Sequence, residues 1–431
     1  MFTSDCLTVK NGVLNIGGCD TLELTQKYGT PLYVMDENTI RTNCRMFKKS
    51  IEDNFENGGL VLFASKALNC LEMCRIVNQE GLGIDCVSGG EIYTALKAKF
   101  PAEKIYFHGN NKTTDELIFA IENNVGVIIV DNKYELEELN ELAKERDLKV
   151  NIMFRIKPGI DAHTHNFVRT GQIDSKFGFA LENGEAYEAV KLTKQMSHLN
   201  LVGLHCHIGS QIFNDAPFKE AAYVMLSFFK KLKDELSVDL ECLNLGGGFA
   251  IKYLESDEHF PYELYMKEVA KIINDYCQKE GLSVPKILIE PGRSIVGAAG
   301  ITLYKVGSVK EIKYIRNYVA IDGGLADNPR YALYDSDYKV LVANKADKEC
   351  DYVATIAGKC CESGDLIQEN VKIPKPEKGD VLAVLSTGAY NYSMASNYNR
   401  IPRPAMVMVN DSDSRIIIKR ETYQDIIKND I

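Results

Sequence analysis

The stretch Leu60-Val61-Leu62-Phe63-Ala64-Ser65-Lys66-Ala67 has the length and composition of a buried β-strand and ends in a lysine. Alternation along such a strand places Leu60, Leu62, Ala64 and Lys66 on one face. An amine at the end of an interior row is desolvated, which lowers its pKa and makes it nucleophilic enough for Schiff-base chemistry. The alternative is a lysine that caps the strand and extends to solvent. The rest of the chain has to decide between these two interpretations.

Short apolar runs alternate with helix-period segments from Leu60 to Gly292. Two helical segments open with capping-box patterns, Ser88-x-x-Glu91 and Thr113-x-x-Glu116. Eight strand–helix units in about 230 residues match a (β/α)8 TIM barrel. An open doubly wound sheet is the alternative, but the GxGxxG turn typical of its first strand is missing. The expected strands are Leu60–Ser65, Gly83–Val87, Ile105–His108, Val127–Asp131, Val150–Ile156, Leu201–His207, Leu240–Leu245 and Ile287–Glu290.

The two flanks of this region have a different pattern. After about residue 300 the chain reads as strands separated by Gly, Pro and Asn turns, and residues 1–36 also contain short strand-like pieces. We therefore expect the TIM barrel to span residues 37–298, and a β-sandwich or β-barrel domain to form from residues 1–36 and 299–431. The strands expected in this second domain are Leu7–Val9, Val13–Ile16, Leu32–Val34, Ile301–Val309, Tyr318–Ile321, Asp351–Ile356, Asp380–Leu385 and Ile416–Lys419.

Composition and charge exclude several classes of protein. The 431 residues carry a net charge of −10, which disfavours nucleic acid or an anionic membrane as a partner. No apolar run reaches the ~18 residues of a membrane span, and the N-terminal residues do not resemble a signal peptide. The 12 cysteines form no CxxC motif, so free thiols in a reducing cytoplasm are expected.

Reactive side chains gather at the carboxyl ends of the expected strands, where TIM barrels place their active sites. Seven of the eight ends carry one, and the remaining end carries Gly246-Gly247-Gly248. Three glycines let backbone N–H groups approach an anion, so we expect a phosphate there, with a plain tight turn as the alternative. The side chains at the other ends are Lys66, Asp85, His108, Asp131, Arg155, His205 with His207, and Glu290.

Histidine pairs and the acidic residue at the last strand admit several roles. His205-x-His207 and His163-x-His165 have the spacing of metal ligands, but no further ligand cluster is apparent, and we expect no metal. Stacking on a planar cofactor ring or a hydrogen-bonded core position is the other use of such a histidine. Glu290 could keep the nitrogen of a pyridine ring protonated, or form a salt bridge with Arg293.

The second domain adds three polar clusters. Two of them are Asp322-Gly-Gly leading to Asn328-Pro-Arg-Tyr-Ala-Leu-Tyr334, and Gly388-Ala-Tyr-Asn-Tyr392. The third is Gly358-Lys-Cys-Cys-Glu-Ser-Gly-Asp365, in which Cys360 or Cys361 could donate a proton. Arginines suit carboxylate substrates because they bind them bidentately.

Several motifs together give the chain a resemblance to the diaminopimelate decarboxylases, which belong to the alanine-racemase-like (fold type III) enzymes that use pyridoxal 5′-phosphate (PLP). The resemblance covers nearly the whole chain in the family's order. The motifs are Phe63-Ala-Ser-Lys-Ala67, His108-Gly-Asn-Asn-Lys112, Pro158-Gly-Ile-Asp-Ala-His-Thr-His165, Asp174-Ser-Lys-Phe-Gly178, His205-Cys-His-Ile-Gly-Ser-Gln211, Glu290-Pro-Gly-Arg293, Cys360-Cys-Glu-Ser-Gly-Asp365 and Tyr390-Asn-Tyr-Ser-Met-Ala395.

The resemblance implies a role for each matching residue. Lys66 would anchor the cofactor covalently, His207 would stack on its ring and act in catalysis, and Cys361 would donate the proton, reached from the partner subunit of a homodimer. Decarboxylation of meso-2,6-diaminopimelate would give L-lysine and CO2, the last step of lysine biosynthesis. The cofactor-binding set would be Lys66, Asp85, His207, Ser210, Gly247, Gly248, Glu290, Gly292, Arg293 and Tyr390. The substrate-binding set would be Arg293, Arg330, Tyr334, Glu362 and Tyr390.

Two departures from the family pattern are Phe63 in place of the frequent Tyr, and Tyr331 in place of the frequent Pro. Neither is an expected ligand, although Tyr331 adjoins Arg330. The main alternative is a related decarboxylase of ornithine, arginine or carboxynorspermidine, which would want an acidic distal pocket without paired arginines. A noncatalytic PLP carrier and a metal-dependent hydrolase are the alternatives from other classes.

Overall fold

The computed structural model describes residue 2, residues 4–160 and residues 174–431, and it divides into two compact units. The barrel unit comprises Asn43–Ala250 and His259–Gly292, and the β unit comprises Met1–Thr42, Ile251–Glu258 and Arg293–Ile431. Among the described residues, no helix combines the length and apolarity needed to cross a membrane.

Eight parallel strands close into a barrel in the first unit. Each pairs with its neighbour in parallel, and the ring closes where β13 pairs with β5 and β9 pairs with β8. The TIM barrel expected from the sequence is therefore confirmed, and every observed strand begins and ends within two residues of the expected bounds. The strands are β5 (Gly59–Ala64), β6 (Gly83–Cys86), β7 (Ile105–Phe107), β8 (Val127–Val130), β9 (Val150–Lys157), β11 (Leu199–Cys206), β12 (Cys242–Asn244) and β13 (Lys286–Ile289).

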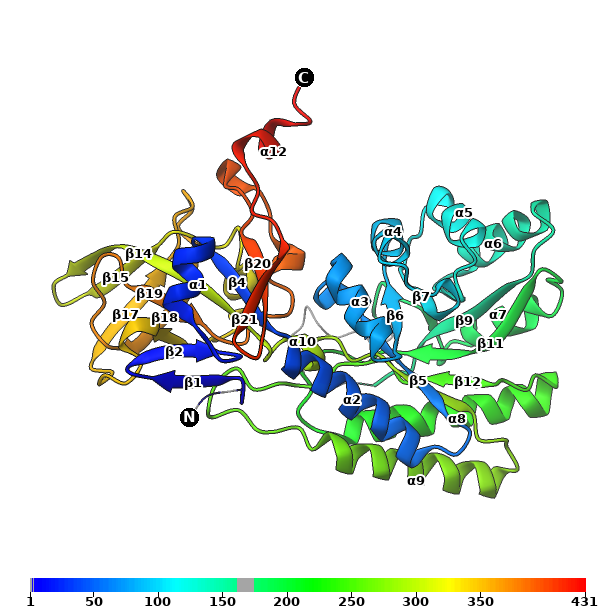
Figure 1. Cartoon of the computed structure of the whole chain (residues 1–431). Coiled ribbons are helices and arrows are strands. Elements are labelled where there is room, and N and C mark those ends of the chain that lie inside the picture. The colour runs from blue at the N-terminus through cyan, green and yellow to red at the C-terminus, as the bar shows by residue number, and fades with distance from the viewer. Residues whose placement is uncertain (1, 3, 161–173) are drawn as a thin grey trace. The chain divides into compact units, whose positions relative to one another are not determined.

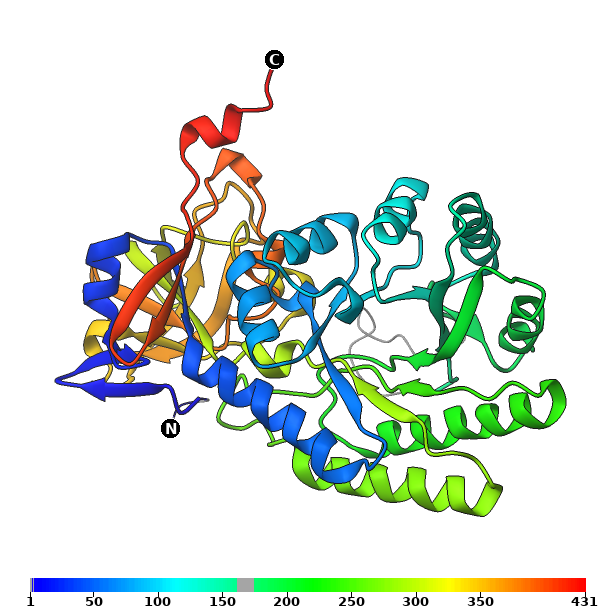
Figure 2. The same cartoon turned by 45° about the vertical axis from the view of Figure 1, so that its right-hand side comes forward.

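Helices lie outside these strands (Figure 1). The expected capping box at Thr113 is present in full, since Thr113 and Glu116 bind each other's backbone N–H groups. The two long helices α8 and α9 lie side by side, as the turned view also shows (Figure 2). The helices of the barrel unit are α3 (Leu71–Gln79), α4 (Gly89–Lys97), α5 (Thr114–Glu122), α6 (Lys133–Glu145), α7 (Glu185–Thr193), α8 (Ala216–Leu236) and α9 (Tyr262–Glu280), and α2 (Glu37–Asn54) contains the unit boundary.

The second unit is mostly β, as expected. Its main sheet has the strand order β18-β17-β15-β14-β4-β20-β21, and β19 pairs with β14 and β16. The N-terminal strand β4 (Leu32–Asp36) pairs with β14 (Gly300–Ile312) and β20 (Ala405–Asn410), so the N-terminal segment is part of this sheet. The remaining strands are β1 (Leu7–Lys10), β2 (Val13–Ile16), β3 (Cys19–Asp20), β15 (Arg316–Ile321), β16 (Val340–Val342), β17 (Tyr352–Ala357), β18 (Leu366–Ile373), β19 (Val381–Val384) and β21 (Asp413–Ile418).

Strands β3, β16, β18 and β20 are absent from the expected set. In β18 the buried positions are Ile367, Gln368 and Ile373, so its apolar residues do not alternate regularly with polar ones. The sequence pattern of a strand is weak where one face carries a buried polar residue. Two helices that carry expected site residues also lie in this unit, namely α10 (Arg293–Val296) and α11 (Arg330–Tyr334).

Candidate active site

The residues expected at the strand ends do meet at one mouth of the barrel. Lys66 is half-buried and lies in the 3₁₀ turn η1 (Ser65–Ala67) directly after β5, so it follows the strand and does not continue its alternating row. This corrects the expectation that the strand itself directs the amine inward. Most of the other side chains are buried, and these are Asp85, His108, Asp131, Arg155, His205 and Glu290.

Glu290 is the most heavily contacted carboxylate of the mouth. Asn244 donates to Glu290 Oε1 at 2.7 Å, and His108 Nε2 lies 3.0 Å from the same oxygen. His205 Nε2 lies 3.3 Å from Glu290 Oε2. Burial alone would raise the pKa of Glu290, but His108 and His205 together lower it well below its usual value. Glu290 is therefore ionised although it is buried.

The pKa of Asp85 is shifted in the opposite direction to that of Glu290. Burial raises the pKa of Asp85, and the nearby charge of His108 opposes the rise only in part. Asp85 Oδ1 lies 3.7 Å from His108 Nε2 and has no hydrogen-bond partner in the described part of the chain. Two carboxyl groups whose pKa values are pushed apart, beside unsatisfied polar atoms, are typical of a ligand site.

The glycine turn after β12 packs closely against the neighbouring strand ends. A Cβ at Gly247 would lie 2.0 Å from the carbonyl oxygen of Glu290, and Gly248 has φ of +110°. The N–H of Gly247 donates to His207 Nδ1 at 3.3 Å, and the N–H of Gly246 donates to Asn244. The turn thus fixes the ring of His207, whose pKa is lowered well below its usual value by burial and by Lys66. His207 is a neutral imidazole.

Three residues of the mouth were missed in the sequence analysis. Ser65 donates to Glu91 Oε2 at 2.6 Å, and the same oxygen accepts the N–H of Val87 at 2.7 Å. The capping box expected at Ser88 is therefore only half formed, because the Glu91 side chain turns toward the residue before Lys66. Asn244 is the third, and its polar side chain inside the run Leu243-Asn244-Leu245 was the available signal.

Expected substrate residues of the β unit form a buried arginine–tyrosine cluster. Arg293 donates to the hydroxyl of Tyr253 at 2.5 Å, and its guanidinium lies 4.7 Å from the ring centre of Tyr390. Arg330 lies over the same Tyr253 ring at 4.7 Å and donates to Tyr338 at 3.2 Å. The structure thus brings Arg293, Arg330 and Tyr390 together, and it adds Tyr253 and Tyr338, for which the sequence held no motif.

Cys361 and Glu362 lie on an exposed loop of the β unit. The loop is shaped by the buried Asp365, which accepts the N–H groups of Leu325 and Cys360, both at 2.6 Å. Burial raises the pKa of the Cys360 thiol to about 11, whereas the adjacent Cys361 is exposed to solvent. Tyr334 is half-buried at the end of α11, and Ser210 and Gly292 follow β11 and β13 in the barrel unit.

The described residues that could bind a metal do not form the two histidine pairs considered from the sequence. Donor atoms of His108, His205 and Glu290 lie within 4.8 Å of one another, whereas the expected partner of His205 was His207. The buried Arg155 guanidinium interacts with the charge of Glu290, which disfavours a further cation there. The pair His163 and His165 lies outside the described residues.

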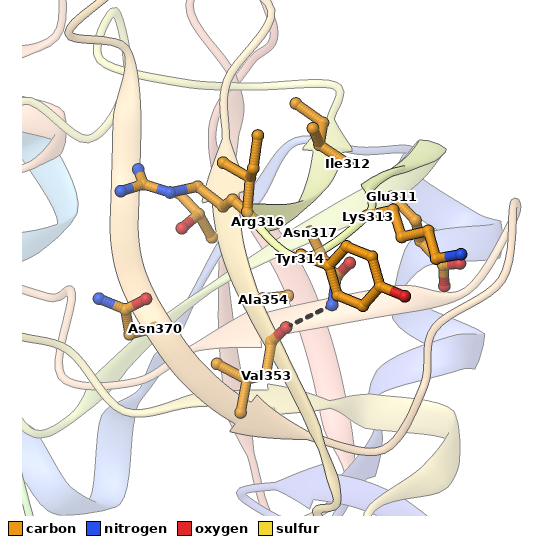
Figure 3. Close-up of a pocket in the computed structure, with 11 residues that line it drawn as sticks. Glu311, Ile312, Lys313, Tyr314, Arg316, Asn317, Val353, Ala354 and Asn370 are labelled. Atoms are coloured by element: carbon orange, nitrogen blue, oxygen red, sulfur yellow. Dashed lines mark hydrogen bonds between the residues drawn. The ribbon is translucent and has the colours of Figure 1, made fainter.

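A surface pocket of about 500 Å³ lies elsewhere, beside the hairpin of β14 and β15 (Figure 3). Asn317 donates to the carbonyl oxygen of Val353 at 2.9 Å on its wall. None of the eleven residues that line it is an expected site residue. It is therefore not part of the candidate active site.

Comparison with known proteins decides the family. Residues 37–297 match the family model described as pyridoxal-dependent decarboxylase, pyridoxal binding domain. The chain is 48% identical to a diaminopimelate decarboxylase of Bacillus subtilis, covering 98% of this chain and 96% of that protein. It is 46% identical to one from Staphylococcus aureus, covering 98% and 100%. The chain belongs to the diaminopimelate decarboxylases.

Solved structures agree with this family. A diaminopimelate decarboxylase from M. jannaschii, determined with L-lysine, superposes with a TM-score of 0.91 at 38% identity, covering 100% of this chain and 99% of that one. A lysine/ornithine decarboxylase from Vibrio vulnificus reaches a TM-score of 0.76 at 23% identity, which shows a shared fold alone. The carrier and hydrolase alternatives are wrong, because the full-length relatives are PLP-dependent carboxy-lyases.

Residues at the barrel mouth of this diaminopimelate decarboxylase fit PLP. Asp85 Oδ1 is buried without a hydrogen-bond partner in the described part of the chain, and the ionised Glu290 suits a protonated ring nitrogen. The close glycine turn leaves no room for side chains where a planar group and its phosphate would need backbone access. The half-buried Lys66 amine is close enough to Asp85, Glu91 and His207 to affect the pKa of each.

Proposed function

We propose that this chain removes CO2 from meso-2,6-diaminopimelate and releases L-lysine. The observation that carries the proposal is 44–48% identity over almost the whole length to several diaminopimelate decarboxylases. The buried Arg293–Arg330 cluster supports it, because the substrate has two carboxylates that paired guanidinium groups bind well. A decarboxylase that forms diamines would not need the second arginine.

PLP, when bound, supplies an electron sink for the electron pair that remains after CO2 departs. Lys66 would hold the cofactor covalently through its amine, whose charge acts on Asp85. The neutral ring of His207 would stack on the cofactor, and the ionised Glu290 would accept a hydrogen bond from the protonated ring nitrogen. The phosphate would be held by Ser210, Gly248, Gly292 and Tyr390, and the cofactor-binding set also includes Gly247 and Arg293.

Substrate recognition and proton delivery are assigned to the β unit. Arg293 and Arg330 bind carboxylate groups, while Glu362, Tyr334 and Tyr390 bind the amino groups and the adjacent polar atoms. Cys361 delivers the proton that replaces CO2, and its exposure supports this role. Because Cys361 lies on an exposed loop, we propose a homodimer in which each active site receives this residue from the partner subunit.

Two further assignments belong to this proposal. The functional domains are a PLP-binding barrel over residues 37–298 and a β domain of residues 1–36 and 299–431. The compartment is the cytoplasm, supported by the fact that all twelve cysteines are free.

A CO2-release assay with competing substrates tests the activity. Purified protein with PLP should release CO2 from meso-diaminopimelate at least about a hundredfold faster, as kcat/KM, than from ornithine, arginine or L-lysine. A preference for ornithine or arginine would support the related decarboxylases instead, and carboxynorspermidine is a further substrate to include.

Two variants test the covalent anchor and the shared site. After borohydride reduction, the cofactor should be attached to Lys66 in the natural protein and to no residue in Lys66→Ala. Cys361→Ala should bind the cofactor normally and lose turnover. Mixing the two inactive variants should restore part of the activity if subunits share sites. Heterodimers without recovered activity would exclude the shared site and leave the decarboxylase assignment intact.

A further inference from the structure

Three side chains from three strands converge on the Glu290 carboxylate inside the barrel unit. Asn244 of β12 donates to Oε1 at 2.7 Å, and His108, directly after β7, lies 3.0 Å from the same oxygen. His205 of β11 lies 3.3 Å from Oε2. All four residues are buried, with Glu290 5% exposed and His205 1% exposed. A carboxylate in such a place is ionised only if several donors face it.

The number of acceptor sites limits what else Glu290 can bind. An ionised carboxylate offers about four lone-pair sites on its two oxygens. Three of these lone-pair sites face Asn244, His108 and His205, so about one lone-pair site remains for a further hydrogen-bond donor. A single remaining acceptor has a defined direction, whereas a carboxylate with fewer contacts could rotate between several partners.

His205 can serve only in one tautomer. Burial lowers the pKa of His205 to about 4, so the ring is neutral near pH 7. Its Nδ1 is buried and has no hydrogen-bond partner in the part of the chain described. Because a neutral imidazole carries one proton, Nε2 must carry it in order to donate to Glu290.

The position of His108 is fixed by an ion pair further from the mouth. The ammonium group of Lys112 donates to Gly109 O at 2.9 Å, to Ile129 O at 2.7 Å and to Glu135 Oε1 at 2.7 Å. All three protons of the ammonium are used. The loop that begins with His108 is therefore tied to the neighbouring strand β8 and helix α6.

We propose that His108 and His205 are positioning residues that keep Glu290 ionised and leave one acceptor of its carboxylate for the ring nitrogen of the cofactor. This inference rests on the proposed role of Glu290 as the partner of that nitrogen. Without the two imidazoles, Glu290 becomes a stronger base beside the raised-pKa carboxyl of Asp85. The shared proton then moves from the ring nitrogen to Glu290, and the ring withdraws electrons less well.

Other groups also face Glu290 and have to be held constant in a test of its basicity. Their charge acts on Glu290, or the charge of Glu290 acts on them, from four of the neighbouring strands. They are Asp85 on β6, Tyr106 on β7, Arg155 on β9, Cys206 on β11 and His207 directly after β11. Substitutions should therefore be confined to His108 and His205.

The test uses holoenzyme reconstituted with cofactor that is ¹⁵N-labelled at the ring nitrogen, whose chemical shift reports protonation directly. The variants are His108→Leu and His205→Leu, which remove the donors, and His108→Gln and His205→Gln, which keep an N–H near the original Nε2. His198→Leu is the matched control, because His198 is half-buried, precedes β11 at the opposite end from the barrel mouth, and places its Nδ1 3.1 Å from the carbonyl oxygen of Leu148. Glu290→Gln gives the shift expected when the carboxylate is removed.

In each Leu variant the ¹⁵N chemical shift of the ring nitrogen should change toward the value of an unprotonated ring. The change should be at least about half of the difference in chemical shift between the natural protein and Glu290→Gln. Each Gln variant should recover most of this change, and His198→Leu should show none. We also expect kcat to fall about tenfold or more while KM changes less than about twofold. If one Leu variant does not fold, the other tests the same proposal independently.

Two outcomes separate this inference from the proposed function. Leu variants that keep a fully protonated ring nitrogen, while Glu290→Gln loses it, overturn the positioning role alone. A Glu290→Gln variant with an unchanged ring nitrogen overturns the proposed role of Glu290 itself. Gln variants that are as impaired as the Leu variants would show that the histidines act through packing, which also overturns the proposal.

Discussion

Two buried carboxylates of the barrel unit and two of the β unit are bound by different kinds of partner. In the barrel unit, Glu135 is held by the Lys112 ammonium at 2.7 Å, and Glu290 is held by side chains of three other strands. In the β unit, Asp365 accepts two backbone N–H groups, and Asp327 accepts the Gly324 N–H at 3.0 Å and the Tyr304 hydroxyl at 2.5 Å.

The different partners indicate different roles for the carboxylates of the two units. Side-chain partners of the barrel leave polar atoms such as Asp85 Oδ1 unsatisfied at the mouth, where a ligand can complete them. Backbone partners of Asp327 and Asp365 instead fix the course of two loops, of which one leads into α11 with Arg330 and the other carries Cys361. Substitutions of the barrel carboxylates should thus change the electrostatics of the barrel unit, whereas substitutions of those in the β unit should change the conformation of its loops.

Breaking the Lys112–Glu135 pair should have the largest effect on stability. Lys112→Met leaves Glu135 buried without its cation and should lower the free energy of unfolding of the barrel unit by about 3–5 kcal/mol. The measurement is urea denaturation followed by pulsed hydrogen exchange of barrel peptides. The exposed pair Lys133–Glu137 supplies the control, and Lys133→Met should change the free energy by less than about 1 kcal/mol.

The double variant Lys112→Met with Glu135→Leu sharpens this test. It removes both charges, so most of the lost stability should return. If Lys112→Met alone were as stable as the natural protein, the ion pair would not hold the loop that begins at His108.

Asp327 should make the β unit less stable as the pH rises. Burial raises the pKa of Asp327 from 3.8 to about 7 in the folded chain. Between these values the folded state binds a proton that the unfolded state has lost, so the stabilisation present below pH 4 is lost up to pH 7. A shift of this size corresponds to on the order of 4 kcal/mol, at about 1.4 kcal/mol per pKa unit.

The pH dependence is measured against Asp327→Asn, which cannot titrate. Both proteins are equilibrated in urea between pH 4 and pH 8 and labelled at a single pH for hydrogen exchange of β-unit peptides. The natural protein should lose stability relative to the variant as the pH rises. Parallel curves would mean that Asp327 is ionised in the folded chain throughout this range.

Removing one acceptor of Asp365 should cost about 2–3 kcal/mol, because Asn has only one side-chain oxygen for two buried N–H groups. Asp365→Asn should also lower turnover, since the loop of Cys361 and Glu362 loses its fixed shape. Faster hydrogen exchange at the peptides of Leu325 and Cys360 is the direct measurement. Asp347→Asn, at an exposed position, is the control and should leave exchange there unchanged.

The sequence predicted the barrel well because its strands are short apolar runs that end in reactive residues. It also predicted which residues gather at the mouth, since parallel strands bring their carboxyl ends together. It could not predict Tyr253 or Tyr338, because their contacts with Arg293 and Arg330 depend on tertiary packing. Nor could it predict that Lys66 would leave the strand in a 3₁₀ turn, since a local turn does not alter the apolar pattern before it.

The smallest expected effect distinguishes the two capping patterns that looked alike in the sequence. Thr113→Ala removes a complete capping box and should lower the free energy of unfolding of the barrel unit by about 1 kcal/mol. Ser88 accepts only the Glu91 N–H at 3.3 Å, so Ser88→Ala should cost less.

Glu91→Gln should instead weaken the contacts with Ser65 and Val87 and reduce cofactor affinity, with little change in stability. Both alanine variants and Glu91→Gln are compared by urea denaturation and by cofactor titration of the apoenzyme. The contrary result is an equal loss of stability in the two alanine variants together with unchanged cofactor affinity in Glu91→Gln. It would mean that Glu91 only caps its helix and that the side-chain contacts of the barrel mouth do not include its carboxylate.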